Sequence, residues 1–77
     1  PVVLSENITI DTDSTGNNGD VTLTSTVISG SAKTLTIKSG SGPVNIGGTI
    51  GGTTNKHLGA LTINSTDGSG NTGTIEV

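Results

Sequence analysis

The sequence predicts an all-β fold, and within that class a parallel β-helix, from three observations. Of the 77 residues, 44 are Thr, Gly, Ser or Asn, and the chain contains no aromatic residue, no Cys and no Met. The aliphatic residues occur in short triplets with a period of two, which places alternate side chains on one face of a strand. These triplets themselves recur at a nearly constant spacing of roughly 25 residues, as expected for a repeat architecture.

The composition excludes several other fold classes. Thr, Ser, Asn and Gly are poor helix formers, so a helical bundle is excluded. An aromatic side chain buries about 150–250 Å², and the lack of any disfavours a conventional sandwich with a single core. Without Cys there is no disulfide to support a small core. Disorder is the remaining alternative, but the regular spacing of the aliphatic residues favours a fold.

Six triplets predict six strands, because each has two aliphatic side chains around one polar side chain, and Val, Ile and Thr suit a pleated surface. In chain order the triplets are Ile8-Thr9-Ile10, Val21-Thr22-Leu23, Leu35-Thr36-Ile37, Val44-Asn45-Ile46, Leu61-Thr62-Ile63 and Ile75-Glu76-Val77. Clusters of turn-forming residues separate them, at 14–19, 29–31, 40–43, 51–55 and 67–73. We expect tight corners with positive φ at Gly47, Gly48, Gly51 and Gly52.

The long-range repeat predicts which strands are neighbours. Residues 35–39 match residues 61–65 at a shift of 26, and residues 8–12 match residues 35–39 at a shift of 27. A second set matches at a shift of 23: residues 21–23 with 44–46, and residues 26–27 with 49–50. Matching strands are expected to stack in register about 4.8 Å apart. The expected inward residues, which form the core and the assembly contacts, are Ile8, Ile10, Val21, Leu23, Val27, Leu35, Ile37, Val44, Ile46, Ile50, Leu61, Ile63, Ile75 and Val77. Thr9, Thr36 and Thr62 are expected to form an outward row.

The repeat also divides the chain. We expect one module over residues 1–77 with about three coils: 8–34, 35–60 and a partial third coil over 61–77. Residues 1–7 form either an N-terminal arm or an incomplete coil. The alternative fold is a jelly-roll or β-sandwich subunit like a pilin, with a donated N-terminal strand; the long-range repeat argues against it.

Three runs of the sequence carry a resemblance to a known class of protein. Residues 21–30, 34–52 and 58–65 resemble the β-strand repeats of giant bacterial adhesins of the filamentous-haemagglutinin type and of autotransporter passenger domains. The resemblance covers nearly the whole chain from Ile8 onward. It implies an exported, fibrous, right-handed parallel β-helix used for adhesion or surface structure, with no catalytic residues to transfer. Members are usually far longer and carry caps, and neither end of this chain resembles a cap.

Charge and hydropathy narrow the expected partners. The net charge is −3, with three Lys against six acidic residues, so no basic face for nucleic acid is expected. No apolar run approaches the ~20 residues of a membrane helix, so membrane insertion is not expected. We expect a structural module of an exported cell-surface or extracellular fibre or adhesin, located at the bacterial cell surface. Its expected partners are copies of itself in a homopolymeric filament, joined end to end through strand edges, or adjoining repeats of a longer chain.

One segment resembles a calcium-binding loop. Asp11 and Asp13 occupy its first and third positions and Gly16 the sixth, with Asp20 nearby. Hard cations prefer several oxygen ligands, but the twelfth position is Thr22 where such loops have Glu. The competing interpretation is a turn in which Asp and Asn side chains bond to the local backbone. Apart from calcium at this segment, no cofactor is expected.

The remaining candidates have structural alternatives of their own. The outward Thr row suggests an ice-binding surface, while residues 53–59, the longest insertion, suggest a ligand site of an adhesin. Asn7 and Asn64 begin glycosylation sequons, which arise readily by chance in a chain rich in Asn and Thr. His57 is the sole histidine and has no local partner for metal binding or catalysis. We expect no enzyme, because carbohydrate-active β-helices need paired carboxylates and aromatic residues.

Overall fold

The computed structural model describes residues 2–14, 17–52 and 55–76, and every regular element within them is a β-strand. The prediction of an all-β fold is therefore confirmed. In chain order the strands are β1 (Val2–Val3), β2 (Ile8–Asp11), β3 (Asp13–Ser14), β4 (Asn17–Asn18), β5 (Val21–Leu23), β6 (Val27–Ile28), β7 (Thr34–Lys38), β8 (Val44–Ile46), β9 (Ala60–Asn64) and β10 (Ile75–Glu76).

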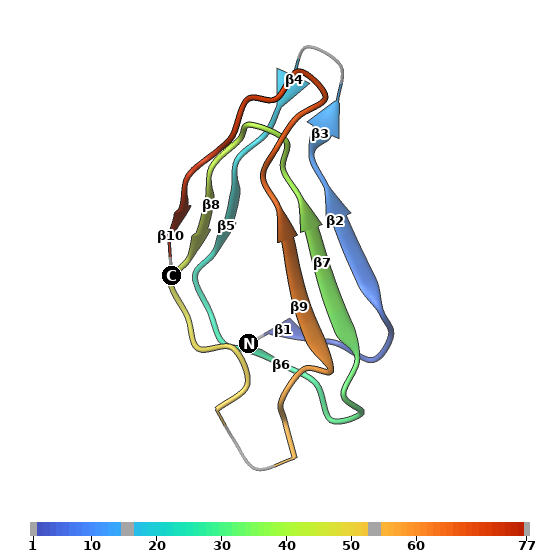
Figure 1. The fold of residues 1–77 in the computed structure, drawn as a ribbon. Helices are drawn as coiled ribbons and strands as arrows, with labels where there is room; N and C mark the ends of the chain where they lie inside the picture. The colour runs from blue at the N-terminus through green and yellow to red at the C-terminus, as the bar shows by residue number, and fades with distance from the viewer. Residues whose placement is uncertain (1, 15–16, 53–54, 77) are drawn as a thin grey trace.

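Two three-stranded parallel sheets contain most of the residues in strands (Figure 1). One sheet has the order β2-β7-β9 and the other the order β5-β8-β10. Along the chain the strands of the two sheets therefore alternate: a strand of the first sheet is followed by one of the second, three times over. The two sheets face each other, and the short parallel pair β1-β6 lies across their lower end in Figure 1. An antiparallel pair, β3-β4, extends from the opposite end. The sheets stay separate, and each keeps open edges.

The strands pair in the register that the sequence repeat predicts. Leu35 on β7 pairs with Ile8 on one side and Leu61 on the other, and Ile37 pairs with Ile10 and Ile63. In the second sheet β8 lies between its two neighbours in the same way, with the pairs Val21↔Val44, Leu23↔Ile46 and Ile75↔Val44. A parallel bridge joins Val27 and Ile50. Aliphatic residues thus form rows that run across neighbouring strands.

The N-terminal residues pair within the chain. Val2 and Val3 lie opposite Val27 and Ile28 in β6, and the backbone N–H of Leu4 donates to the carbonyl of Ile28 at 2.9 Å. Val2 and Val3 therefore have a strand partner inside the chain. The parallel pairing also differs from the antiparallel strands of the jelly-roll alternative.

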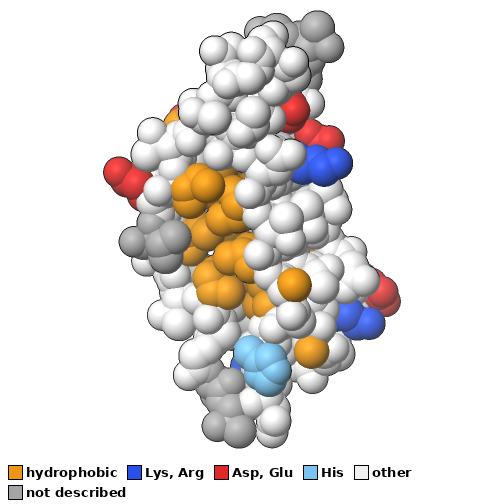
Figure 2. Space-filling model, viewed as in Figure 1, with side chains coloured by type: hydrophobic (Ala, Val, Ile, Leu, Met, Phe, Trp, Pro, Cys, Tyr) orange, Lys and Arg blue, Asp and Glu red, His pale blue; other side chains and the backbone are white. Residues whose placement is uncertain are grey.

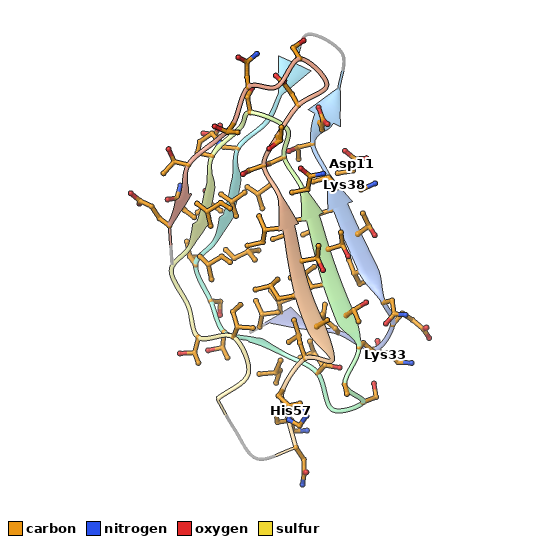
Figure 3. The ribbon with its side chains drawn as sticks, in the orientation of Figure 1. Asp11, Lys33, Lys38 and His57 are labelled. Atoms are coloured by element: carbon orange, nitrogen blue, oxygen red, sulfur yellow. The ribbon has the colours of Figure 1, made fainter. Side chains whose placement is uncertain are left out.

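The core lies between the two facing sheets (Figure 3). In β7 the inward Leu35 and Ile37 are buried, while the outward Thr36 and Lys38 are half-buried and exposed, as the period of two requires. The buried aliphatic residues are Leu4, Val21, Val27, Leu35, Ile37, Val44 and Ile46. Leu4, which was not among the expected inward residues, is part of this core.

Some expected core residues are more exposed than their middle-strand partners. Ile8, Leu61 and Ile75 pair within the expected rows but keep 40%, 38% and 44% of their surface exposed. The reason is their place on the outermost strands β2, β9 and β10, where one side of each row has no neighbour. The half-buried members of the expected core are Ile10, Leu23, Ile50 and Ile63. Val77 lies outside the described residues.

Glycine allows adjacent strand stretches to approach closely at the corners. A Cβ added at Gly42 would overlap the carbonyl oxygen of Gly19, and one added at Gly73 would overlap that of Gly42. Positive φ is confirmed at Gly51 and Gly52. The prediction of positive φ is wrong for Gly47 and Gly48, because the backbone after β8 turns with φ outside the positive region at these two residues.

Candidate functional site

The two sets of outermost strands form the candidate functional site. We call β1, β2 and β5 the first edge, and β9 and β10 the last edge. Each of these strands pairs on one side with an inner strand, and within the described part of the chain nothing pairs with its other side. The free side of a β-strand presents N–H and C=O groups that can pair with a further strand.

Both edges expose aliphatic side chains. On the first edge Val2, Val3 and Ile8 are 42%, 61% and 40% exposed, and on the last edge Leu61 and Ile75 are exposed as stated above. Figure 2 shows an apolar patch in the region between β9 and β10. Contiguous apolar surface of this kind marks interaction sites in soluble proteins. The chemistry available at these edges is therefore backbone pairing combined with burial of aliphatic rows.

The outer face of the first sheet carries polar rows in register. Asp11 lies opposite Lys38 (Figure 3). Lys38 lies opposite Asn64 on its other side, so the row has one acid, one lysine and one neutral amide. The neighbouring row consists of Thr9, Thr36 and Thr62, as predicted. This Thr surface is bounded by the charged row, so it is narrow. Strand pairing of opposite charges contributes roughly 0.2–1 kcal/mol per pair.

The structure does not assemble the calcium candidate. Within residues 2–14, 17–52 and 55–76, no three side chains of the His, Cys, Asp and Glu types form a group that could hold a metal ion. Asp11, Asp13 and Asp20 are therefore not brought together. Instead the Oδ1 atom of Asp11 accepts the backbone N–H of Asp13 at 3.0 Å, and β3 pairs with β4 directly afterwards. This is the alternative interpretation, a side chain that stabilises a local turn.

A second acidic loop, residues 65–73, is organised by Asp67. Its Oδ1 atom accepts the backbone N–H groups of Ser69 and Asn71, each at 2.9 Å, and the Asn71 side chain donates to Oδ2 at 3.3 Å. These bonds, first of all the one from the Asn71 backbone, hold the pKa of Asp67 below its ordinary value of 3.8. The carboxylate is solvent-exposed and serves to order the loop.

Two buried serines were not predicted as structural residues. Ser29 and Ser39 are both fully buried. The Oγ atom of Ser29 donates to the carbonyl of Leu4 at 2.9 Å and accepts the backbone N–H of Lys33 at 3.0 Å, so it joins three segments. The Oγ atom of Ser39 has no hydrogen-bond partner among the described residues. The available signal was a Ser-Gly pair at the end of each strand region, although Ser29 was expected in a turn and Ser39 at the end of the matched segment 35–39.

The longest insertion, residues 53–59, contains the expected ligand site and the sole histidine. Residues 53 and 54 lie outside the described part, while Lys56 and His57 are exposed. The carbonyl of Lys56 accepts the backbone N–H of Ser29 at 3.0 Å, which ties the insertion to the end of β6.

The two sequon asparagines accept hydrogen bonds from the backbone. Asn7 Oδ1 accepts the N–H of Thr34 at 3.0 Å, and Asn64 Oδ1 accepts the N–H of Thr66 at 3.1 Å.

Within the described residues, no helix has the length and hydropathy to cross a membrane. No protein-family model matches the chain, and neither a curated protein nor a solved structure matches it.

Proposed function

We propose that the chain is a structural module of an exported cell-surface or extracellular fibre or adhesin. In this proposal it forms three coils of a right-handed parallel β-helix. The observation that carries the proposal is the parallel pairing of residues separated by about one coil of sequence, such as Ile8 with Leu35 and Val21 with Val44. Crossover connections between parallel strands are right-handed in nearly all proteins, which supports the hand.

Three sets of matched positions support the coil assignment. The chain passes first through the β1-β6 pair, then through the β2-β7-β9 sheet, then through the β5-β8-β10 sheet, and repeats this order. The bridge from Val27 to Ile50 supplies the third position beside β1 and β6. Each coil thus contributes one segment to each set. Such stacking lets aliphatic rows fill a narrow interior without aromatic side chains.

The proposed mechanism is mechanical. In a stack of coils the backbone hydrogen bonds between parallel strands run along the stacking direction. A force along that direction is shared by all the bonds between two coils, and the buried rows around Ile37 and Val44 resist separation by keeping water out. Repeat proteins of this type gain stability from each contact between neighbouring units. The module therefore suits a load-bearing or spacing role.

In the proposal, the open edges extend the stack. Further coils pair with the first and last edges, and they come either from other copies or from adjoining repeats of a longer chain. The exposed aliphatic residues Ile8, Leu61 and Ile75 become buried in the process. A contact between two different edges does not close on itself, so it leads to a filament.

A second candidate function is ice binding, and the in-register row Thr9-Thr36-Thr62 is the observation in its favour. The adjoining row of Asp11, Lys38 and Asn64 interrupts the Thr surface on one side. A thermal-hysteresis measurement on the isolated chain decides this alternative. Freezing and melting points that coincide exclude it.

Electron microscopy and X-ray fibre diffraction of the isolated chain at neutral pH test the main proposal. We expect filaments with an axial spacing near ~4.8 Å and a rise of about 14 Å per module, which corresponds to three coils. A chelator should leave them unchanged. A rise several times larger would favour bulkier subunits joined by donated strands. Dispersed particles at millimolar concentration would contradict self-assembly.

A further inference from the structure

We propose that the last edge of one copy pairs in parallel with the first edge of a second copy, in a single register. This inference rests on the proposed function and specifies the partner and the contacts. In the proposed register Leu61 lies opposite Ile8, and Ile63 lies opposite Ile10. In the second sheet Ile75 lies opposite Val21 of the next copy.

The inner rows are the first argument for this register. Inside the paired strands the inward rows are aliphatic, for example Ile10-Ile37-Ile63. The proposed contact continues each row with another aliphatic side chain and covers Leu61 and Ile8, which are 38% and 40% exposed. A slip of one residue would turn the aliphatic side chains of one strand to the outer face. The in-register arrangement is thus the one that extends the core.

Slips of two residues keep the inward and outward faces but are also unfavourable. One such slip places Leu61 opposite Glu6, and the other places Ile63 opposite Thr12. Either arrangement places a polar side chain where the aliphatic row should continue, and burial of the Glu6 carboxylate without a partner is also costly. The flanking residues Glu6 and Thr12 therefore define the register from both ends of β2.

The outer rows are the second argument. The row Asp11-Lys38-Asn64 would continue with Asp11 of the next copy, so that each acid has an amide on one side and a lysine on the other. In the second sheet Glu76, which pairs with Asn45, would meet Thr22. The proposed register therefore places no like charges opposite each other in these rows.

The distribution of acids favours a head-to-tail contact over a head-to-head contact. Residues 1–20 carry four acidic residues and no Lys, whereas all three Lys follow later in the chain. Two first edges facing each other would bring these acids together. A head-to-head contact has a two-fold axis perpendicular to the stack, and only one sheet could then pair with the same sheet of the second copy. A head-to-tail contact is a translation along the stack, so both sheets and the β1-β6 pair continue into their counterparts.

Disulfide cross-linking tests the register, and the chain contains no cysteine of its own. The matched variant carries Thr9→Cys and Thr62→Cys, two exposed positions that meet in the proposed register. Within one copy they are separated by Thr36, at about twice the strand spacing of ~4.8 Å. That distance exceeds the ~7 Å limit for a disulfide. The offset control carries Thr9→Cys and Asn64→Cys, which lie diagonally, roughly 7–8 Å apart.

On oxidation of assembled protein, we expect the matched variant to give a ladder of covalent multimers, at least about ten-fold more than the offset control. Circular dichroism under reducing conditions verifies that both variants fold like the unmodified chain. Equal ladders would overturn a single register. A covalent dimer from Thr62→Cys alone would overturn the head-to-tail contact, because it requires two last edges to meet.

The same experiment separates failure of this inference from failure of the proposed function. Filaments that form without any cross-link in the matched variant would overturn the register but leave the structural module in place. If neither filaments nor cross-links form, the edges do not pair with a second copy, and both proposals of self-association fail.

Discussion

Ile37 represents the residue scale most clearly, because it is the central member of an aliphatic row. It is fully buried and pairs with Ile10 on one side and Ile63 on the other. Its neighbour Thr36 lies on the same strand but faces outward, between Thr9 and Thr62. Adjacent residues of β7 therefore experience opposite environments, and substitutions at the two positions should have opposite consequences.

We expect Ile37→Asp to lower the free energy of unfolding by more than about 4 kcal/mol, because a carboxylate in an aliphatic row has no partner. Such a loss is comparable to the whole stability of a small domain, so the variant should be unfolded. Thr36→Asp is the matched control and should retain the fold. Urea unfolding followed by circular dichroism measures both, and an unchanged midpoint for Ile37→Asp would rule out the inward assignment.

The two buried serines offer a second comparison at this scale. Ser29→Ala would leave the carbonyl of Leu4 and the N–H of Lys33 without their partner, at an expected cost of about 1–3 kcal/mol. Ser39→Ala removes a buried hydroxyl that bonds to none of the described residues, so it should not destabilise the fold. Equal costs in urea unfolding would contradict the role assigned to Ser29 in joining three segments.

At the scale of structural elements, the corners decide how closely successive strands can stack. Gly42 and Gly73 form part of a corner row in which each residue lies against the carbonyl of the preceding one. We expect Gly42→Ala to destabilise the fold by about 1–3 kcal/mol, as overpacking does. Gly68→Ala is the control, because no atom lies within 4 Å of the added Cβ. Thermal unfolding compares them, and a smaller effect at Gly42 than at Gly68 would disprove the close approach.

The Asp67 loop gives a pH dependence at the same scale. The pKa of Asp67 is lowered in the folded state, chiefly by the backbone N–H of Asn71, so the folded loop prefers the carboxylate. Its contribution to stability is therefore present above the ordinary pKa of 3.8 and is lost as the pH falls through the lowered folded value. The effect should be small, because the group is exposed to solvent.

An NMR titration of the Asp67 side chain checks this prediction, with the urea-unfolded chain as the reference for the ordinary pKa. We expect a lower midpoint in the folded chain, and the amide signals of Ser69 and Asn71 should shift with the same midpoint. Identical midpoints in the folded and unfolded chains would show that the loop does not favour the ionised form.

At the scale of the whole molecule, stability should grow with the number of stacked coils. In a direct tandem fusion of two copies, Leu61 and the next Ile8 are 24 positions apart, against 27 from Ile8 to Leu35 and 26 from Leu35 to Leu61 in the same sheet. Ile75 and the next Val21 are 23 positions apart, the same separation as Val21 and Val44. The fusion can therefore continue both sheets with connections like those within the chain.

We expect this fusion to unfold at a higher temperature than the single chain, with a urea m-value about twice as large. Leu61→Lys in the first copy lies at the junction and should remove the gain. The same substitution in the second copy lies on the free last edge and should retain it. Equal unfolding temperatures for the single chain and the fusion would mean that the copies fold independently.

The sequence by itself determined the all-β class, the parallel register and the order of the rows. These follow from local alternation, as in Leu35-Thr36-Ile37, together with a long-range repeat that identifies Ile8 and Leu61 as partners of Leu35. A period of two assigns faces, and a constant separation assigns neighbours. Both kinds of information are present in one dimension, so they could be derived without coordinates.

Only the tertiary structure decided how completely each residue is covered and which corner atoms touch. Ile8 and Ile37 belong to similar rows, yet one is 40% exposed and the other is buried, because a row ends at the outermost strand. Ser29 contacts Leu4, and Gly42 approaches the carbonyl of Gly19, although both pairs are far apart in the sequence. Contacts of this kind depend on the path of the backbone around each corner, which the composition of a Gly- and Ser-rich turn does not specify.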